Sequence, residues 1–259
     1  MTTMPAIQDA LPKTSDPGCS LDRLVTLPPP YYEDECATIY CGDCREIVPA
    51  LAPVDLILTD PPYRHEHTDG GGIVRKTSIY KTAKFAEMSE FEPADFFPEC
   101  FKLQARVNAV IFASRDLIPE YAALAKGHKF DVHVLHKPNA VPFCKSTFKS
   151  DLEYLCLIYD AGRPFQNGLG ERAYSKVSRF ILGSTKERLH PTVKPLDTML
   201  KYVSILSPAG GIVLDPFMGS GTTLLAAIQL GRKAIGIELD PKYCEVAKQR
   251  LAQRVMLAV

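Results

Sequence analysis

Short apolar runs alternate with amphipathic stretches along most of the chain. Runs such as 54–59 and 108–113 are mostly apolar, which is typical of strands buried on both faces of a sheet. Amphipathic stretches of helical period separate several of these runs, and this alternation predicts an α/β fold. Strands are expected at 37–41, 54–59, 108–113, 131–136, 154–159, 211–214 and 234–237, and helices at 44–51, 94–106, 118–126, 195–206, 222–230 and 241–254.

Three segments depart from this pattern. Residues 1–34 are rich in Pro, Ser, Thr and Asp and predict a flexible N-terminal arm, so that a single domain would span 35–259. Segment 64–93 is polar, glycine-rich and basic, and is interpreted as a lid or as a solvated surface insertion. Segment 161–190 carries six basic residues against two acidic ones, which fits either a phosphate-contacting surface or a solvated face.

Composition narrows the class of protein. The 259 residues include 30 Lys and Arg and 30 Asp and Glu, so a nucleic-acid-binding face would be a local patch. No apolar run approaches the roughly 18 residues needed to cross a bilayer, which predicts a soluble, cytoplasmic protein. Eight cysteines without a secretory context are expected to be reduced. Cys41 and Cys44 lack a second Cys or His pair at metal spacing, so no metal site is expected.

An acidic residue and an aromatic residue follow the apolar run at 54–59. Pro61 and Pro62 end the strand because neither has an N–H for the sheet, and Pro61 holds Asp60 extended. The Asp60 carboxylate and the Tyr63 ring are therefore expected at the carboxyl edge of the sheet, where open α/β sheets bind their ligands. A strand-ending turn with a capping Asp is the plainer interpretation.

A glycine-rich turn follows the apolar run at 211–214. Asp215 ends that strand, Gly219 and Gly221 precede the helix, and Glu238 ends the next strand 19 positions after Gly219. Glycines let the backbone approach a ligand, and an acid at this spacing accepts hydrogen bonds from ribose hydroxyls. The pattern predicts a bound nucleoside, with nicotinamide dinucleotides and S-adenosylmethionine both open. The absence of a third glycine disfavours a pyrophosphate.

Three blocks of sequence carry a family resemblance. They are Asp55–Tyr63 with Gly42-Asp43, then His190–Pro195, then Leu214–Thr223 with Gly236–Glu238. In this order they resemble DNA amino-methyltransferases of the permuted class, which methylate N6 of adenine or N4 of cytosine with S-adenosylmethionine. The resemblance implies a Rossmann-like methyltransferase fold with a seven-stranded mixed sheet in circularly permuted order. It also implies a cofactor-binding half at 191–259, a catalytic lid at 64–93 and a small target-recognition insert at 161–190.

The resemblance also implies residue roles. Asp60 and the Pro61 carbonyl would accept hydrogen bonds from the amine of a flipped-out base, with Pro62 beside them and Tyr63 stacked on the base. Lys194 would approach the methionine carboxylate of the cofactor, and Glu238 would bind the ribose. The full set of cofactor candidates is Asp43, Thr192, Lys194, Asp215, Pro216, Phe217, Gly219, Ser220, Gly221, Thr222 and Glu238, and the DNA-binding candidates are Arg64, Arg75, Lys76, Arg172, Lys176 and Arg179.

Several activities are compatible with these features. Asp at position 60 favours adenine-N6 methylation, with cytosine-N4 as the alternative. A methyltransferase for RNA or a protein amide, and a catalytically silent DNA-binding module, remain as other classes. The expected partner is double-stranded DNA in a bacterial or phage-infected cell, and the family resemblance implies a homodimer. Roles in restriction-modification, in a phage and in regulation are all open.

Overall fold

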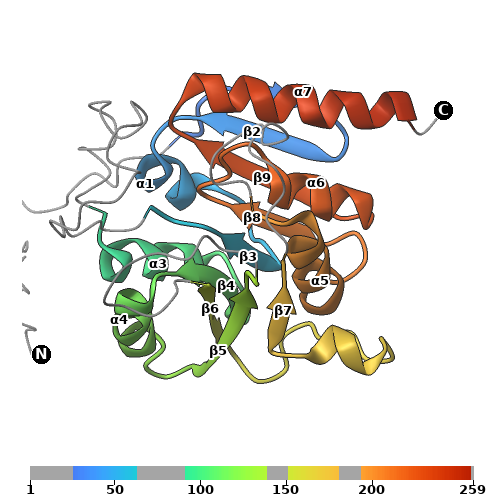
Figure 1. The fold of residues 1–259 in the computed structure, drawn as a ribbon. Helices are drawn as coiled ribbons and strands as arrows, with labels where there is room; N and C mark the ends of the chain where they lie inside the picture. The colour runs from blue at the N-terminus through green and yellow to red at the C-terminus, as the bar shows by residue number, and fades with distance from the viewer. Residues whose placement is uncertain (1–25, 63–90, 139–150, 181–193, 258–259) are drawn as a thin grey trace, which may run out of the picture.

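One mixed sheet organises the molecule. The structure is a computed structural model that describes residues 26–62, 91–138, 151–180 and 194–257. Among these residues, nine strands form a single sheet in the order β1-β2-β9-β8-β3-β4-β6-β5-β7 (Figure 1). The strands are β1 (Tyr32–Glu33), β2 (Ala37–Cys41), β3 (Leu56–Thr59), β4 (Asn108–Ala113), β5 (Lys129–His136), β6 (Leu152–Tyr159), β7 (Val177–Arg179), β8 (Ile212–Asp215) and β9 (Lys233–Glu238).

Helices cover both faces of the sheet, as the alternating pattern predicts (Figure 1). Alternate residues of β3 show the division: Leu56 and Leu58 pack with the helices of one face, and Ile57 packs with those of the other. The first face carries α5 (Leu196–Leu206), α6 (Thr222–Gln229) and α7 (Pro241–Leu257), and the second carries α1 (Cys44–Ile47), η1 (Val48–Ala50), α3 (Pro93–Lys102), η4 (Arg115–Leu117) and α4 (Ile118–Leu124).

The described sheet has nine strands, whereas the family resemblance implies seven. The seven expected strands are all present, and β1 and β7 add one short strand at each edge. β1 pairs antiparallel with β2 and lies within the segment interpreted as an N-terminal arm, ahead of position 35. β7 pairs in parallel with β5 and lies within segment 161–190, which also contains the 3-10 turn η5 (Glu171–Tyr174). Strands of two and three residues are too short to show a period, so they depend on the neighbouring strand.

The topology brings distant segments to one edge. β2, β9, β8, β3 and β4 are all parallel, so their carboxyl ends meet at the same edge of the sheet. Two strands from the C-terminal part of the chain, β8 and β9, lie between β2 and β3, and β3 is therefore central. This edge places the residues after Cys41, Thr59, Asp215 and Glu238 side by side.

Some boundaries differ from the predicted ones. α3 ends at Lys102 rather than 106, because the chain turns at Leu103 and lies against Val54, whose N–H donates to the Leu103 carbonyl. β5 begins at Lys129, two residues before the predicted start, because it pairs with β6 over its whole length. No helix in the described part of the chain is long and apolar enough to cross a membrane.

Gly236 in β9 offers a test of the packing behind the candidate site. A Cβ at this position would lie 2.4 Å from Sδ of Met218 and 2.8 Å from Cδ2 of Leu224, so Gly236→Ala would overpack the core. We expect a loss of about 1–3 kcal/mol in the free energy of unfolding, measured by urea denaturation. Gly170→Ala is the control, since nothing lies within 4 Å of its Cβ and its φ of −55° suits alanine. Equal stability of the two variants would contradict this account.

Candidate active site

The centre of the site is the end of β3. Leu56, Ile57 and Leu58 have no exposed surface, and β3 is paired with β8 on one side and β4 on the other. Asp60 and Pro61 follow this strand directly, and the Asp60 side chain keeps 23% of its surface exposed. A rigid strand therefore presents a carboxylate at the sheet edge, as the sequence predicts.

A buried hydrogen bond joins β3 to β8. Thr59 Oγ1 donates to Oδ1 of Asp215 over 2.7 Å, and the Phe217 N–H donates to the same oxygen over 3.1 Å. Burial raises the pKa of Asp215 to about 6, against the hydrogen bonds from Thr223, Thr59 and Phe217, which lower it. The contact fixes the residues after β8 relative to those after β3.

The glycine-rich turn after β8 has the backbone that its sequence requires. Gly219 and Gly221 have φ angles of +50° and +78°, which residues with a Cβ rarely adopt. A Cβ on Gly221 would also lie 2.9 Å from that of Ala247 in α7. From the same helix, Arg250 Nη1 donates to Oγ of Ser220 over 3.0 Å and to Oγ1 of Thr222 over 3.2 Å. The turn is thus held on one side by α7.

Glu238 connects this turn to the next strand. Its Oε2 accepts from the Gly219 N–H over 3.1 Å, and its Oε1 accepts from the Asp240 N–H over 2.8 Å. Burial raises the pKa of Glu238, and these two backbone hydrogen bonds oppose that shift. The Gly42 N–H donates to the Glu238 carbonyl, so Asp43 lies beside this residue. Asp43 caps α1 and forms an ion pair with Arg45, whose hydrogen bond lowers the pKa of Asp43.

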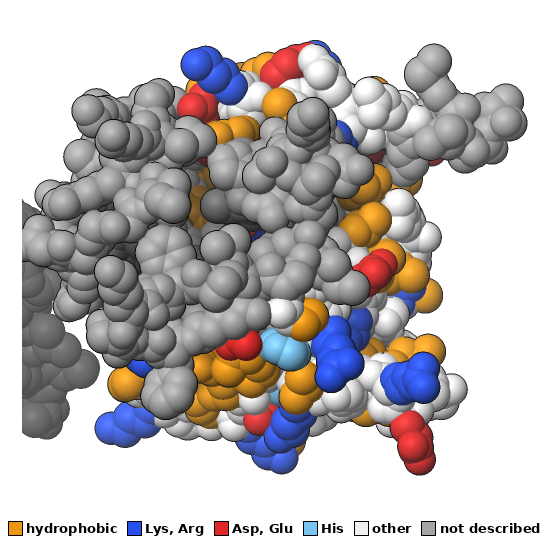
Figure 2. Space-filling view, viewed as in Figure 1, with side chains coloured by type: hydrophobic (Ala, Val, Ile, Leu, Met, Phe, Trp, Pro, Cys, Tyr) orange, Lys and Arg blue, Asp and Glu red, His pale blue; other side chains and the backbone are white. Residues whose placement is uncertain are grey.

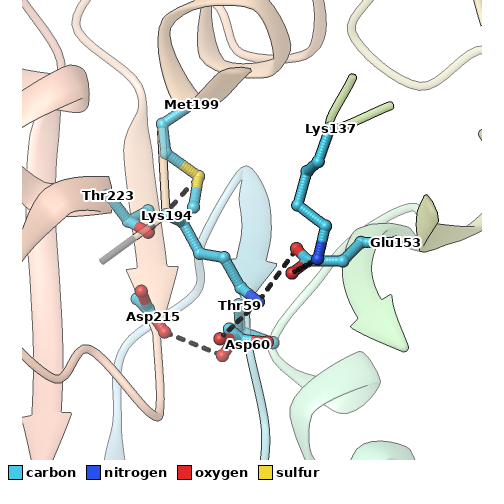
Figure 3. A network of polar contacts seen from close by, with 8 residues as sticks. All are labelled: Thr59, Asp60, Lys137, Glu153, Lys194, Met199, Asp215 and Thr223. Carbon is cyan, nitrogen blue, oxygen red and sulfur yellow. Dashed lines mark hydrogen bonds and ion pairs between the residues drawn. The ribbon is translucent and has the colours of Figure 1, made fainter. Parts of the chain in front are cut away.

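Lys194 takes a position that its sequence context does not indicate. Its Nζ lies 3.1 Å from Oδ2 of Asp60 and 3.2 Å from Oε2 of Glu153, and Glu153 Oε1 in turn contacts Nζ of Lys137 over 2.9 Å (Figure 3). Burial alone would lower the pKa of Lys194, but the Asp60 and Glu153 carboxylates raise it. The Phe112 ring lies 4.9 Å from the same ammonium.

Phe217 packs on the other side of the turn. Its ring meets those of Phe91 and Phe96 edge to face, with centroids 5.0 and 5.3 Å away. Phe91 and Phe96 are themselves buried, and both belong to the core around α3. Phe217 is half-buried, which is compatible with both interpretations of its role, as a core residue and as a cofactor contact.

The structure brings together residues from all three sequence blocks. The described candidates Asp43, Asp60, Lys194, Asp215 and Glu238, with the turn at 216–222, share one sheet edge. Arg172, Lys176 and Arg179 lie apart from them at the β7 side. Tyr63, Arg64, Arg75, Lys76 and Thr192, and the lid at 64–93 up to residue 90, lie outside the described residues.

Sequence reasoning missed three contributing side chains. No sequence motif marks any of them. Lys137 follows β5, Glu153 lies in β6 and Arg250 lies in α7. The one signal for Glu153 in the sequence is its position, directly before the apolar run at 154–159. Within the described residues, no group of three His, Cys, Asp or Glu side chains is arranged to hold a metal ion.

Comparison with known proteins agrees with this arrangement. The family model described as "DNA methylase", which covers N6 and N4 enzymes, matches residues 54–249. The chain belongs to this DNA methylase family. The matched range includes both the Asp60 strand end and the Gly219–Glu238 turn.

Individual relatives of this N6/N4 methylase cover most of its length. YubD of Escherichia coli (strain K12), which carries a provisional name as a methylase, is 31% identical over 83% of this chain and 91% of its own. The type II methyltransferase M2.LlaDCHI of Lactococcus lactis subsp. cremoris is 27% identical over 88% and 93%. The crystal structure of an M1.HpyAVI–SAM complex superposes with a TM-score of 0.65 at 27% identity, covering 83% of this methylase and 98% of that chain.

The raised pKa of Asp215 predicts a pH-dependent stability. Between its ordinary value of 3.8 and about 6, the folded methylase keeps the Asp215 proton while the unfolded chain releases it. The stability that Asp215 contributes is therefore complete below pH 3.8 and is lost as pH rises through 6. Asp215→Asn keeps the Oδ1 acceptor and does not titrate. We expect its stability relative to wild type to rise by about 2–3 kcal/mol from pH 4 to pH 7, measured by urea denaturation.

Other titrating groups are common to both proteins, so the difference between them isolates Asp215. A difference in unfolding free energy that stays constant over this pH range would contradict the raised pKa.

Proposed function

We propose that this chain transfers a methyl group from S-adenosylmethionine to the N6 amine of an adenine flipped out of double-stranded DNA. One observation carries the proposal. The carboxylate of Asp60 and the turn at 216–222 extend from neighbouring strands, β3 and β8, and the Thr59–Asp215 hydrogen bond fixes one against the other. An acid that holds the amine beside a turn that holds the methyl donor would bring the two reactants together.

The donor set around the turn fits this cofactor. A Cβ on Gly219 would have no atom of the described residues within 4 Å, which leaves room for a ligand beside the turn, and the Glu238 carboxylate would accept hydrogen bonds from the ribose hydroxyls. Asp43 lies beside Glu238, on the side where the adenine amine is expected. S-Adenosylmethionine, when bound, supplies an electrophilic methyl group on a sulfonium. The SAM complex of the related M1.HpyAVI supports this choice.

Asp60 and Pro61 would prepare the amine for attack. An exocyclic amine is a poor nucleophile because its lone pair is delocalised into the ring. Hydrogen bonds from its two N–H groups to the Asp60 carboxylate and the Pro61 carbonyl would draw the nitrogen towards tetrahedral geometry. The nitrogen gains a bond to the methyl carbon as the carbon–sulfur bond breaks, its electron pair remaining on sulfur, and one amine proton leaves to Asp60 or to water. Asp60 thus acts mainly by position and charge.

Adenine is favoured over cytosine by the residue at position 60. An Asp at the start of the Asp-Pro-Pro-Tyr motif resembles the adenine-N6 members more than the cytosine-N4 members. The cytosine-N4 enzyme PvuII methyltransferase has a similar fold at 17% identity, which bears on the fold alone. Cytosine-N4 is therefore the second candidate activity.

Basic side chains near β7 would contact the DNA backbone. Arg172, Arg179 and Lys201 line one hollow together with the start of α5, and Lys201 was not among the sequence candidates. Figure 2 shows Lys and Arg side chains gathered over this part of the face. Lys176 forms an ion pair with Asp131 over 2.5 Å, which reduces the charge that it offers to phosphate. We also propose the predicted homodimer, since 161–190 offers little surface for reading a site.

A product assay tests the proposed reaction. The protein is incubated with unmethylated duplex DNA and labelled S-adenosylmethionine, and the DNA is digested to nucleosides for mass analysis. We expect N6-methyl-2′-deoxyadenosine as the product, and Asp60→Asn is expected to lower kcat by about 10²–10³-fold because it removes the charged acceptor. If N4-methylcytosine is the sole product, the target base is cytosine and the proposal of adenine is wrong. Labelled RNA or protein, with unlabelled DNA, would overturn the proposal.

Salt dependence of DNA binding tests the surface near β7. Arg179 is exposed at the end of β7, on the same edge as Asp60, so Arg179→Gln should remove about one phosphate contact. We expect the slope of log K against log salt concentration to fall by about one in magnitude, measured by fluorescence anisotropy. Lys129→Gln is the control, since Lys129 is exposed at the start of β5 and lies at the opposite edge. Equal slopes for the two variants would show that the surface near β7 does not contact the DNA phosphates.

A further inference from the structure

Four side chains of alternating charge form a line at the active-site edge. Asp60, Lys194, Glu153 and Lys137 contact one another in that order, over 3.1, 3.2 and 2.9 Å (Figure 3). They come from four separate parts of the chain, namely the ends of β3 and β5, the start of β6 and the segment two residues before α5. The two lysines keep only 12% and 17% of their side-chain surface exposed. Charges buried to this extent require partners.

Strand register explains why three of these side chains lie on the same face. Phe112 of β4 is opposite Leu155 of β6, and Glu153 is two residues from Leu155, so both project towards α5. Leu135 of β5 is opposite Glu153, and Lys137 lies two residues beyond it. Asp60 projects to this face as well, two residues after the core residue Leu58. The face is the one that α5 covers.

Lys194 reaches this face from the chain preceding α5. Its stem passes the ring of Phe112, 4.9 Å from the ammonium, and its Nζ lies between the carboxylates of Asp60 and Glu153. A lysine ammonium is a point charge on a flexible stem, so one carboxylate alone does not fix its position. A second carboxylate on the opposite side does, and Glu153 is itself held by Lys137.

We infer that Glu153 is a positioning residue for methyl transfer, which holds the Lys194 ammonium against Oδ2 of Asp60 so that the carboxylate is oriented towards the target amine. The inference rests on the proposed function, because Asp60 matters in this way only if it accepts an amine. It also revises the role expected for Lys194. In this structure its ammonium is engaged by the acid that would bind the base, and the sequence had indicated the methionine carboxylate of the cofactor.

The two roles for Lys194 predict different kinetics. A lysine that orients Asp60 affects the chemical step, so its loss lowers kcat and leaves cofactor affinity nearly unchanged. A lysine that binds the methionine carboxylate affects cofactor affinity first. Glu153, acting through Lys194, should follow the first pattern.

A double-mutant cycle tests this on the full chain with duplex DNA. We expect Glu153→Gln to lower kcat by about tenfold and Lys194→Met by about 100-fold, with the Kd for S-adenosylmethionine within about threefold of wild type by calorimetry. We expect Glu153→Gln combined with Lys194→Met to be no slower than Lys194→Met alone, because Glu153 has no effect once the ammonium is gone. Glu153→Asp, which keeps the charge, should retain more activity than Glu153→Gln.

Glu99→Gln is the matched control, because Glu99 pairs with Lys102 on the exposed side of α3 and lies outside the site. Circular dichroism checks that each variant folds, and if Glu153→Gln does not, Glu153→Met, which also removes the charge, takes its place in the cycle.

Three outcomes would overturn the inference. These are an unchanged kcat in the Glu153 variant, losses that multiply in the double variant, and a rise in the Kd for S-adenosylmethionine that accounts for the whole loss of activity. A wild-type protein that methylates no DNA would instead overturn the proposed function, and the inference with it.

Discussion

The hydrogen bond from Thr59 to Asp215 joins residues 156 positions apart and determines how the two halves of the site meet. Thr59 has no exposed surface and Asp215 has 3%, so both polar groups need partners inside the protein, and Asp215 also accepts from the Phe217 N–H. The bond forms only when β3 and β8 pair in the observed register, which also brings Asp60 next to the turn at 216–222. A one-residue shift of either strand would break this buried hydrogen bond and move Asp60 away from the turn at 216–222.

Charge at this edge is arranged in two ways. Asp215 and Glu238 are acids whose pKa burial raises, and backbone N–H groups bind and orient their oxygens. Glu153 and Lys194 are half-buried, and each lies between two groups of opposite charge, whose effect on its pKa outweighs that of burial. The part of the edge formed by β8 and β9 thus relies on backbone donors, and the part around Asp60 on a line of ion pairs.

The sequence predicted most strands and helices because apolar runs and helical period are visible within a few neighbouring residues. The apolar runs at 37–41 and 108–113 match β2 and β4 residue for residue, since a strand buried on both faces needs no partner to be recognised. The edge strands β1 and β7 were missed because two or three residues carry no period. Asp60 and Glu238 were found because prolines and glycines fix the backbone around them. Glu153 was missed because its role comes from strand register, which pairs β6 with β4 and β5.

By itself, the sequence determined the succession of strands and helices, the positions where the backbone must turn, and the residues that resemble a methyl-transfer site. These depend on side-chain type, on periodicity and on the φ angles open to Gly and Pro, all of which act over a few residues. Only the tertiary structure decided that β8 and β9 lie between β2 and β3, and that Lys194 contacts Asp60 and Glu153. Contacts of this kind join segments far apart in the chain, and they follow from strand order, register and the pairing of buried charges, which no local pattern contains.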